Sequence, residues 1–368
     1  MPSHGTRSTE NQPAPLSVSS ALARLAGIGV VILLVVAGFL SLGGWFSPHE
    51  LTPIRFVNGF EKVFGVQSGF RRNHAKGVCV SGFFDSNGQA KRLSKAALFR
   101  TGRAPVIGRF SLGGGHPYVG DAPDTIRGLG LLFRLPDGEQ RRTAMINRPV
   151  FPVHTPQAFY DNLIASKPDP NTHKPDPKKI AAFLASHPES VRAAKIIQSQ
   201  EVSSGFPNST FNGLTAFRFI NANGVSTPVR WSMVPMDAFK PADTAQSANP
   251  NKNYLFDDLI ARIHRAPVQW RLIVTVGQPG DPTDDATIPW PEGREQVDAG
   301  TLTLDEVESE APGNCRDVNF DPLLLPVGIA PSDDPLLSAR SAVYSQSFTR
   351  RAGEKKAPSA ITPADVHK

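Results

Sequence analysis

The longest apolar run of the chain lies near its N-terminus. Residues 25–46 (LAGIGVVILLVVAGFLSLGGWF) contain no charged side chain. As a helix this run would be about 33 Å long, enough to cross a hydrocarbon core of roughly 30 Å. The alternative, a core helix of a soluble protein, would have to be covered on every side. We therefore expect one transmembrane helix here, preceded by a disordered tail at residues 1–24.

The charges around this run predict its orientation. Arg24 directly precedes it, and the next cation on the other side is Arg55. Because the cytoplasmic flank carries the excess of Lys and Arg, we expect a cytoplasmic tail, an inner-membrane span and a periplasmic domain. Trp45 and Phe46 would lie at the outer interface. The leader is long for a signal peptide and no clear A-x-A site follows, so an uncleaved single-pass anchor is favoured over a cleaved signal segment.

Beyond residue 47, short apolar runs separated by Gly, Asn and Ser predict strands. They are VCVSGFF, AALF and VIGRFSL between residues 78 and 111, then residues 130–135, 217–220, 229–234 and 272–276. Ser86-Asn87-Gly88 and Asn221-Ala222-Asn223-Gly224 have the composition of hairpin turns. Strands at this spacing indicate an antiparallel barrel or a sandwich.

Other segments have apolar positions at helical spacing. They are two short helices within 178–197 that are separated at Pro188, residues 253–264 and residues 335–348, while residues 51–64 alternate between helical and turn signals and are a candidate short docking helix. Residues 277–295 are expected to form a loop and residues 352–368 a polar tail. The pattern therefore predicts an α+β domain at residues 47–351.

Composition narrows the classes of protein that fit. The 368 residues include 34 Pro, which disfavours coiled coils and long helices. The net charge is +6, without a run of five like charges, so no nucleic-acid partner is expected. The two cysteines, Cys79 and Cys315, are too few for a cysteine-rich zinc site. In an oxidising compartment they would be able to form a disulfide, and two buried free thiols are the alternative.

Two places carry residues suited to redox or acid–base chemistry. Arg340 and Tyr344 are four apart on a predicted helix and share one face. A guanidinium stabilises a phenolate, which is a hard anionic ligand for ferric iron; the alternative is an exposed arginine beside a core tyrosine. His74 is flanked by cations that favour its neutral, proton-accepting form. Taken alone, a histidine of this kind is more often structural or exposed.

Several motifs together carry a family resemblance. The chain contains R-x-x-H-A-K-G, R-F-S, N-F-D-P followed by P-x-G-I-x-P-S-x-D, and R-x-x-x-Y, in this order. In this combination it resembles the haem catalases, and more closely their short branch of catalase-related peroxidases, over residues 51–351. The resemblance implies a catalase-like antiparallel β-barrel with surrounding helices and a non-covalent b-type haem.

The resemblance also implies roles for individual residues. His74 matches the distal histidine, and Ser111 matches the serine that supports its imidazole. Tyr344 matches the proximal iron ligand, with Arg340 beside it. The other positions that match haem contacts are Arg71, Arg109 and Arg351, as propionate partners, and Phe159, which would pack against the porphyrin.

One departure from the family concerns a distal asparagine in a stretch N-N-x-P. Here the stretch is Met145-Ile146-Asn147-Arg148-Pro149, and Ile146 takes the amide position. An alkyl side chain cannot orient a peroxide by hydrogen bonding. A slipped loop would bring Asn147 in instead, so Asn147 is kept as a candidate catalytic residue. We expect weak or no catalase turnover.

The predicted function is reduction of H₂O₂ or organic hydroperoxides by a small external reductant. No counterpart of the helical domain of full-size catalases follows Arg351, so no NADPH site and a monomer or dimer are expected. Two alternatives stay open. One is a non-enzymatic haem carrier or sensor, and the other is an enzyme that rearranges fatty-acid hydroperoxides.

Overall fold

The computed structural model describes residues 17–42 and 50–367, in two units that divide after Thr52. The first unit contains the helix α1 (Val18–Leu42). Its segment Val18–Ser41 is long and apolar enough to span a membrane, a test of length and composition that a signal sequence near the N-terminus also passes. The helix begins at Val18 and not at residue 25, so the end of the expected disordered tail is helical. Trp45 and Phe46 lie outside the described residues.

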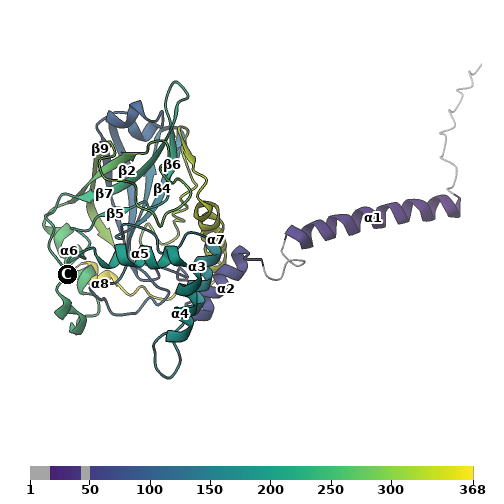
Figure 1. Cartoon of the computed structure of the whole chain (residues 1–368), viewed down its shortest axis with the longest axis horizontal. Coiled ribbons are helices and arrows are strands. Elements are labelled where there is room, and N and C mark those ends of the chain that lie inside the picture. Colours follow the sequence, from purple (N-terminus) through teal and green to yellow (C-terminus); the bar gives the residue numbers. More distant parts are fainter. Residues whose placement is uncertain (1–16, 43–49, 368) are drawn as a thin grey trace, which may run out of the picture. The chain divides into compact units, whose positions relative to one another are not determined.

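Eight strands of the second unit close into an antiparallel barrel (Figure 1). Their order is β7-β5-β4-β3-β2-β1-β9-β8, and pairing of β7 with β8 completes the ring. Closure leaves no free edge in the ring. The strands are β1 (Gly77–Ser86), β2 (Gly102–Leu112), β3 (Arg127–Arg134), β4 (Gln140–Ile146), β5 (Phe211–Asn212), β7 (Ser226–Pro235), β8 (Val268–Val276) and β9 (Gln296–Glu308), with β6 (Phe217–Ile220) and β10 (Ile329–Pro331) attached beside β7.

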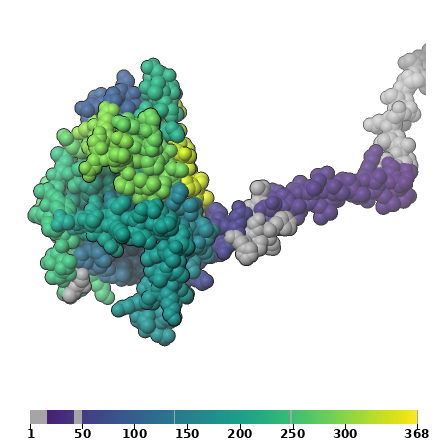
Figure 2. Space-filling view, viewed as in Figure 1, coloured from purple at the N-terminus to yellow at the C-terminus, as the bar shows by residue number. Residues whose placement is uncertain are grey.

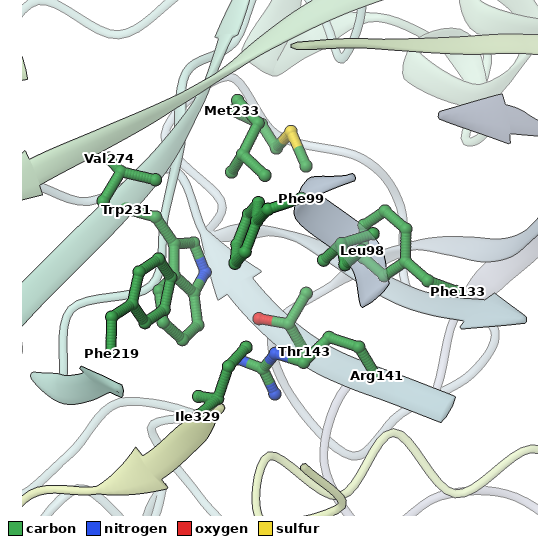
Figure 3. A pocket seen from close by; sticks show the side chains of 11 residues that line it. Leu98, Phe99, Phe133, Arg141, Thr143, Phe219, Trp231, Met233, Val274 and Ile329 are labelled. Atoms are coloured by element: carbon green, nitrogen blue, oxygen red, sulfur yellow. The ribbon is translucent and has the colours of Figure 1, made fainter. Parts of the chain in front are cut away.

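The barrel core consists mainly of alternate large apolar side chains. Phe84, Phe110, Leu131 and Trp270 are fully buried in it. A small cavity of about 20 Å³ remains in this core. Its lining includes Arg141 of β4 and Trp231 of β7, which lie beside each other (Figure 3). The Arg141 guanidinium is 4.6 Å from the centroid of the Trp231 ring, a distance at which the ring face attracts a cation.

Arg141 also explains why the strand β4 was not predicted from the pattern of apolar residues. The buried positions of β4 are Arg141, Thr143 and Met145. Two of these side chains are polar, so the alternation of apolar and polar residues that marks a strand is lost. The long strand β9 was missed as well, and its pairing with β1 and with β8 is interrupted by register shifts.

Two local expectations were wrong. The run AALF is not a strand, because residues Ala97–Phe99 form a 3₁₀ helix, η2. Ser86-Asn87-Gly88 does not close a tight hairpin. Gly88 instead takes a left-handed conformation (φ 81°) and leads into a second 3₁₀ helix, η1 (Gln89–Arg92), before β2 begins. The turn at residues 221–224 does connect β6 and β7 as predicted, with Asn221 N donating to Val225 O.

The predicted helices are confirmed, and two helices, α3 and α8, are added. The helices are α2 (Pro53–Phe64), α3 (Pro156–Ala165), α4 (Pro177–Ser186), α5 (Pro188–Gln198), α6 (Tyr254–Arg265), α7 (Pro335–Ala352) and α8 (Pro363–Val366). The helix α3 was not predicted; it starts at an N-cap, Thr155, followed by proline. In the space-filling view the teal segment from α3 to α5 covers part of the face turned to the reader (Figure 2).

The C-terminal segment is not a solvated tail. Ile361 and Val366 are buried in the main core, and Ser309 Oγ donates a 2.6 Å hydrogen bond to Ile361 O. The apolar positions that anchor it are too few to produce a periodic signal. Helices α2, α3 and α7 contact one another beside the barrel (Figure 1), and this group forms the outer wall of the candidate site.

Candidate functional site

A cavity of about 710 Å³ lies between the barrel strands β2, β3 and β4 and the helices α2, α3 and α7. Eight of the nine predicted site residues line it. They are Arg71, His74, Arg109, Ser111, Phe159, Arg340, Tyr344 and Arg351. The chain positions of these residues span from 71 to 351, so only the tertiary fold brings them together. The ninth residue, Asn147, does not line the cavity.

His74 is held in a constrained position at the entrance to β1. Its backbone is left-handed (φ 55°), a conformation that costs roughly 1–3 kcal/mol for a residue other than glycine. The Asn73 side chain compensates, because its Oδ1 accepts hydrogen bonds from His74 N (3.0 Å) and Gly114 N (2.9 Å). The imidazole Nδ1 lies 3.1 Å from Ser111 Oγ. The orientation of the ring is therefore fixed by contacts to the backbone of His74 and to its imidazole.

Gly128 in β3 makes room for this pair. A Cβ atom at this position would lie 2.8 Å from Ser111 Oγ and 3.0 Å from the imidazole ring of His74. The first contact is shorter than real Cβ contacts and the second is unusually tight, so any side chain here would displace Ser111 and press on His74. Asn73 and Gly128 were not identified from the sequence, because neither residue type marks a site by itself.

Electrostatics keep the His74 imidazole neutral. Burial, and to a smaller extent the guanidinium groups of Arg109, Arg340 and Arg71, together lower its pKa to about 3. Desolvation and nearby positive charge both disfavour the imidazolium ion. A neutral ring whose Nδ1 donates to Ser111 Oγ carries a free Nε2 that can accept a proton.

Three guanidinium groups meet at one edge of the cavity. Arg109 is bound in two places by the buried carboxylate of Glu310, at 2.7 and 3.1 Å, and also donates to His74 O at 2.9 Å. Arg71 Nη2 donates to Cys315 O and Val318 O. Arg351 Nη1 donates to Arg316 O at 2.6 Å. Glu310 was not identified from the sequence, since it belongs to no motif.

This edge has donor groups that lack a partner among the described residues. Arg71 Nε and Arg351 Nη2 are buried and make no hydrogen bond there. Buried N–H groups of this kind are rare unless a ligand or water satisfies them. Burial and the neighbouring guanidinium groups lower the pKa of Arg71 and bring that of Arg351 to about 10. Since Glu310 neutralises Arg109, the remaining charge fits an anionic ligand with two carboxylates.

The helix α7 presents Arg340 and Tyr344 on one face. It begins at Pro335, as predicted, and the side chain of the preceding residue, Asp334, accepts a hydrogen bond from Leu336 N. Arg340 Nη2 donates to Ala144 O of β4 at 3.1 Å, which fixes the helix against the barrel. Tyr344 lines the cavity and packs against a buried cluster that consists of Leu132, Phe320 and the Cys79–Cys315 disulfide. The two cysteines thus form the disulfide that the sequence left open.

Aromatic rings form an apolar wall. Phe159 of α3 stacks on Phe151 (centroids 5.7 Å apart, interplanar angle 11°) and on Phe56 of α2 (5.5 Å, 26°). All three line the cavity. Such a wall suits a flat apolar ring system. Together with the free N–H groups at Arg71 Nε and Arg351 Nη2 and the phenol of Tyr344, it fits the donor set and shape that a haem requires.

Ile146, and not Asn147, faces the cavity. Ile146 is the last residue of β4, paired with Gly128, and it lines the site. Asn147 continues the ladder instead, since its N donates to Arg127 O (3.0 Å) and its Oδ1 accepts from Arg127 N (2.8 Å). The slipped loop that would bring Asn147 into the cavity is therefore not what the structure has.

Comparison with known proteins gives a consistent assignment. Residues 69–360 match the family model "Catalase". The chain is 40% identical to a catalase-related peroxidase of Synechococcus elongatus over 89% of this chain and 96% of that protein. It is 32% identical to a catalase-related peroxidase of Mycolicibacterium paratuberculosis over 82% and 96% of the two chains. Catalase A of Saccharomyces cerevisiae has a similar fold, with a TM-score of 0.70 at 20% identity, covering 85% of this chain and 66% of that one.

The lowered pKa of His74 predicts a pH dependence of stability. In the unfolded chain the imidazole has a pKa of about 6.5. Between pH 6.5 and 3 the unfolded chain binds more protons than the folded one, so the free energy of unfolding should fall as the pH falls through this range. His74→Gln should flatten this dependence, as measured by urea unfolding of the cofactor-free protein. His264→Gln, at an exposed site, is the control; equal slopes for all three proteins would contradict the prediction.

Proposed function

Since the chain belongs to the catalase family, we propose that it is a peroxidase that reduces hydrogen peroxide or organic hydroperoxides at a bound haem, with electrons from an external donor. It is an oxidoreductase acting on peroxide, like its relatives named catalase-related peroxidase. The observation that carries the proposal is the convergence of His74, Ser111, Tyr344 and the guanidinium edge on one cavity.

In this proposal Tyr344 is the iron ligand and the edge arginines hold the propionates. Arg71 and Arg351 have buried N–H groups without a partner among the described residues, and these groups would bind the two carboxylates. Arg109 would contact a propionate less directly than the family resemblance implied, because its guanidinium is already bound to the Glu310 carboxylate. Phe159 would pack against the macrocycle. When bound, haem supplies the iron at which the O–O bond of the peroxide is broken.

His74 would move the proton that this cleavage requires. Its neutral Nε2 takes a proton from one peroxide oxygen and returns it to the other, so that neither hydroxide nor an alkoxide has to leave as an anion. Ser111 keeps the ring in the required tautomer by accepting from Nδ1. A haem carrier or sensor would have no use for this His–Ser pair, which favours the peroxidase over that alternative.

Ile146 supports a preference for peroxidase over catalase chemistry. Its alkyl side chain stands where an amide would help to orient the second peroxide. An external donor would then supply the electrons. The identity of that donor, the absence of a nucleotide cofactor and a monomeric or dimeric state stay predictions, as does the rearrangement of fatty-acid hydroperoxides as an alternative activity.

We also propose that α1 anchors the chain in the inner membrane with the domain on the periplasmic side. The helix has a mean hydropathy of 2.4 over its most apolar part, and Arg24 lies near its N-terminal end. The disulfide is consistent with an oxidising space. A cleaved signal segment would export the same domain without an anchor.

Separate removal of the His74 and Tyr344 side chains tests the assignment. His74→Ala should keep the haem absorbance and lose reactivity toward peroxide by roughly 10²–10⁴-fold, because the proton acceptor is lost. Tyr344→Phe should lose affinity for hemin, because the anionic ligand is lost. Absorption titration and stopped-flow reaction with peroxide measure the two effects. Full peroxide reactivity in His74→Ala would overturn the mechanism.

Oxygen release tests the preference for peroxidase chemistry. The wild-type protein with H₂O₂ and no donor should release oxygen slowly, and it should oxidise an aromatic donor faster in the same preparation. Ile146→Asn should raise the rate of oxygen release, because an amide then faces the cavity. Rapid oxygen release by the wild type, measured with an oxygen electrode, would contradict the prediction.

Carbonate extraction of membranes tests the anchor. The full chain, produced with an added N-terminal affinity tag, should stay in the membrane pellet and keep that tag. Leu33→Arg combined with Val36→Arg should abolish insertion, because each central arginine costs roughly 2.5–3.5 kcal/mol. Ser20→Arg, near Arg24 at the helix start, is the control. Loss of the tag from the exported wild-type domain would identify a cleaved signal instead.

A further inference from the structure

One irregular segment supports all three edge arginines. Residues 309–321 contain only turns and extended chain. Within this segment Glu310 binds Arg109, and the carbonyl groups of residues 315, 316 and 318 accept hydrogen bonds from Arg71 and Arg351. Carbonyl acceptors on an irregular segment can only fix a guanidinium if the segment itself is fixed.

The Cys79–Cys315 disulfide fixes this segment to the barrel. Cys79 lies in β1 directly opposite Arg109 of β2. The bond joins residues that are 236 positions apart, with 5.3 Å between their Cα atoms, and Cys315 N also donates to Cys79 Sγ. Both cysteines are fully buried. Gly313 permits this closeness, since a Cβ atom there would lie 3.0 Å from Cys79 Sγ.

The disulfide also contacts the other side of the site. Phe320 and Leu132 form a buried cluster with the two cysteines, and Tyr344 packs against that cluster. One covalent bond is therefore connected to the proposed iron ligand through packing and to the guanidinium edge through backbone carbonyl groups. No other covalent cross-link joins elements within the described part of the chain.

We propose that the Cys79–Cys315 disulfide is a positioning element for cofactor retention. It holds residues 315–318 so that Arg71 and Arg351 can bind the two propionates, and the chain retains haem tightly only after the bond has formed. This inference rests on the proposed haem function. Formation of the bond removes two electrons and two protons from the thiols of Cys79 and Cys315. These electrons and protons pass to the disulfide of an external protein, which becomes a dithiol. Tight retention would then begin only in an oxidising compartment.

The rate of hemin loss to excess apomyoglobin tests the proposal. Full-length holoprotein is compared with Cys79→Ser/Cys315→Ser and with Val274→Ala as a control. Val274 is buried in the barrel, lines the small cavity there and does not line the haem cavity, so its truncation lowers stability without touching the site. The cysteine variant should release hemin roughly tenfold faster or more, and Val274→Ala should match the wild type.

A double-mutant cycle separates positioning from general destabilisation. Arg71→Gln should speed hemin release in the wild-type background, and it should have a much smaller effect when the disulfide is absent. Equal effects in both backgrounds, or unchanged hemin release in the cysteine variant, would overturn the proposal.

If the cysteine variant does not fold, wild-type holoprotein treated with a thiol reductant replaces it. Hemin loss should then follow the appearance of the two thiols, as counted by alkylation and mass spectrometry. Reduced protein that keeps its hemin at the original rate would overturn the proposal. A wild-type protein that binds no hemin at all would instead contradict the proposed function, so the two failures are distinguishable.

Discussion

The burial of three guanidinium groups at one edge of the cavity is the constraint on which the site depends. Glu310 binds Arg109 and neutralises it, and the exposed Asp317 lies 3.9 Å from Arg351. The remaining positive charge has two consequences. It adds to the burial of the imidazole in lowering the pKa of His74, and it leaves buried N–H groups of Arg71 and Arg351 available to an anion. The same charges thus prepare the proton acceptor and favour a dicarboxylate cofactor.

The barrel supplies the rigid wall that makes this arrangement stable. Ser111 and Arg109 project from one strand, β2, and the absence of a side chain at Gly128 lets the imidazole of His74 approach that strand. The opposite wall is helical, and it is fixed to the barrel by the hydrogen bond from Arg340 to Ala144 O. Closure of the sheet means that a shift of one strand would have to be shared by its neighbours, so the site residues keep their spacing.

Much of the fold could be predicted because its signals are local. Apolar positions at helical spacing marked α7 at residues 335–348, and short apolar runs marked β7 and β8. The prediction failed where tertiary contacts replaced the local signal. In β4 the inward residues Arg141 and Thr143 are tolerated because a guanidinium can stack on Trp231 inside the barrel. The last residues of the chain were expected to be a solvated tail, yet Ile361 and Val366 are buried.

For the site, the sequence by itself determined which residue types with redox and acid–base chemistry are present and in what order, since His74, Ser111, Tyr344 and the arginines lie in short motifs that can be read along the chain. It also determined that Cys79 and Cys315 are the only cysteines. Whether they are joined, which residue neutralises Arg109, and whether Ile146 or Asn147 faces the cavity were decided by the tertiary structure alone. These three outcomes depend on strand register and on contacts between residues far apart in the chain, and a motif contains no information about either.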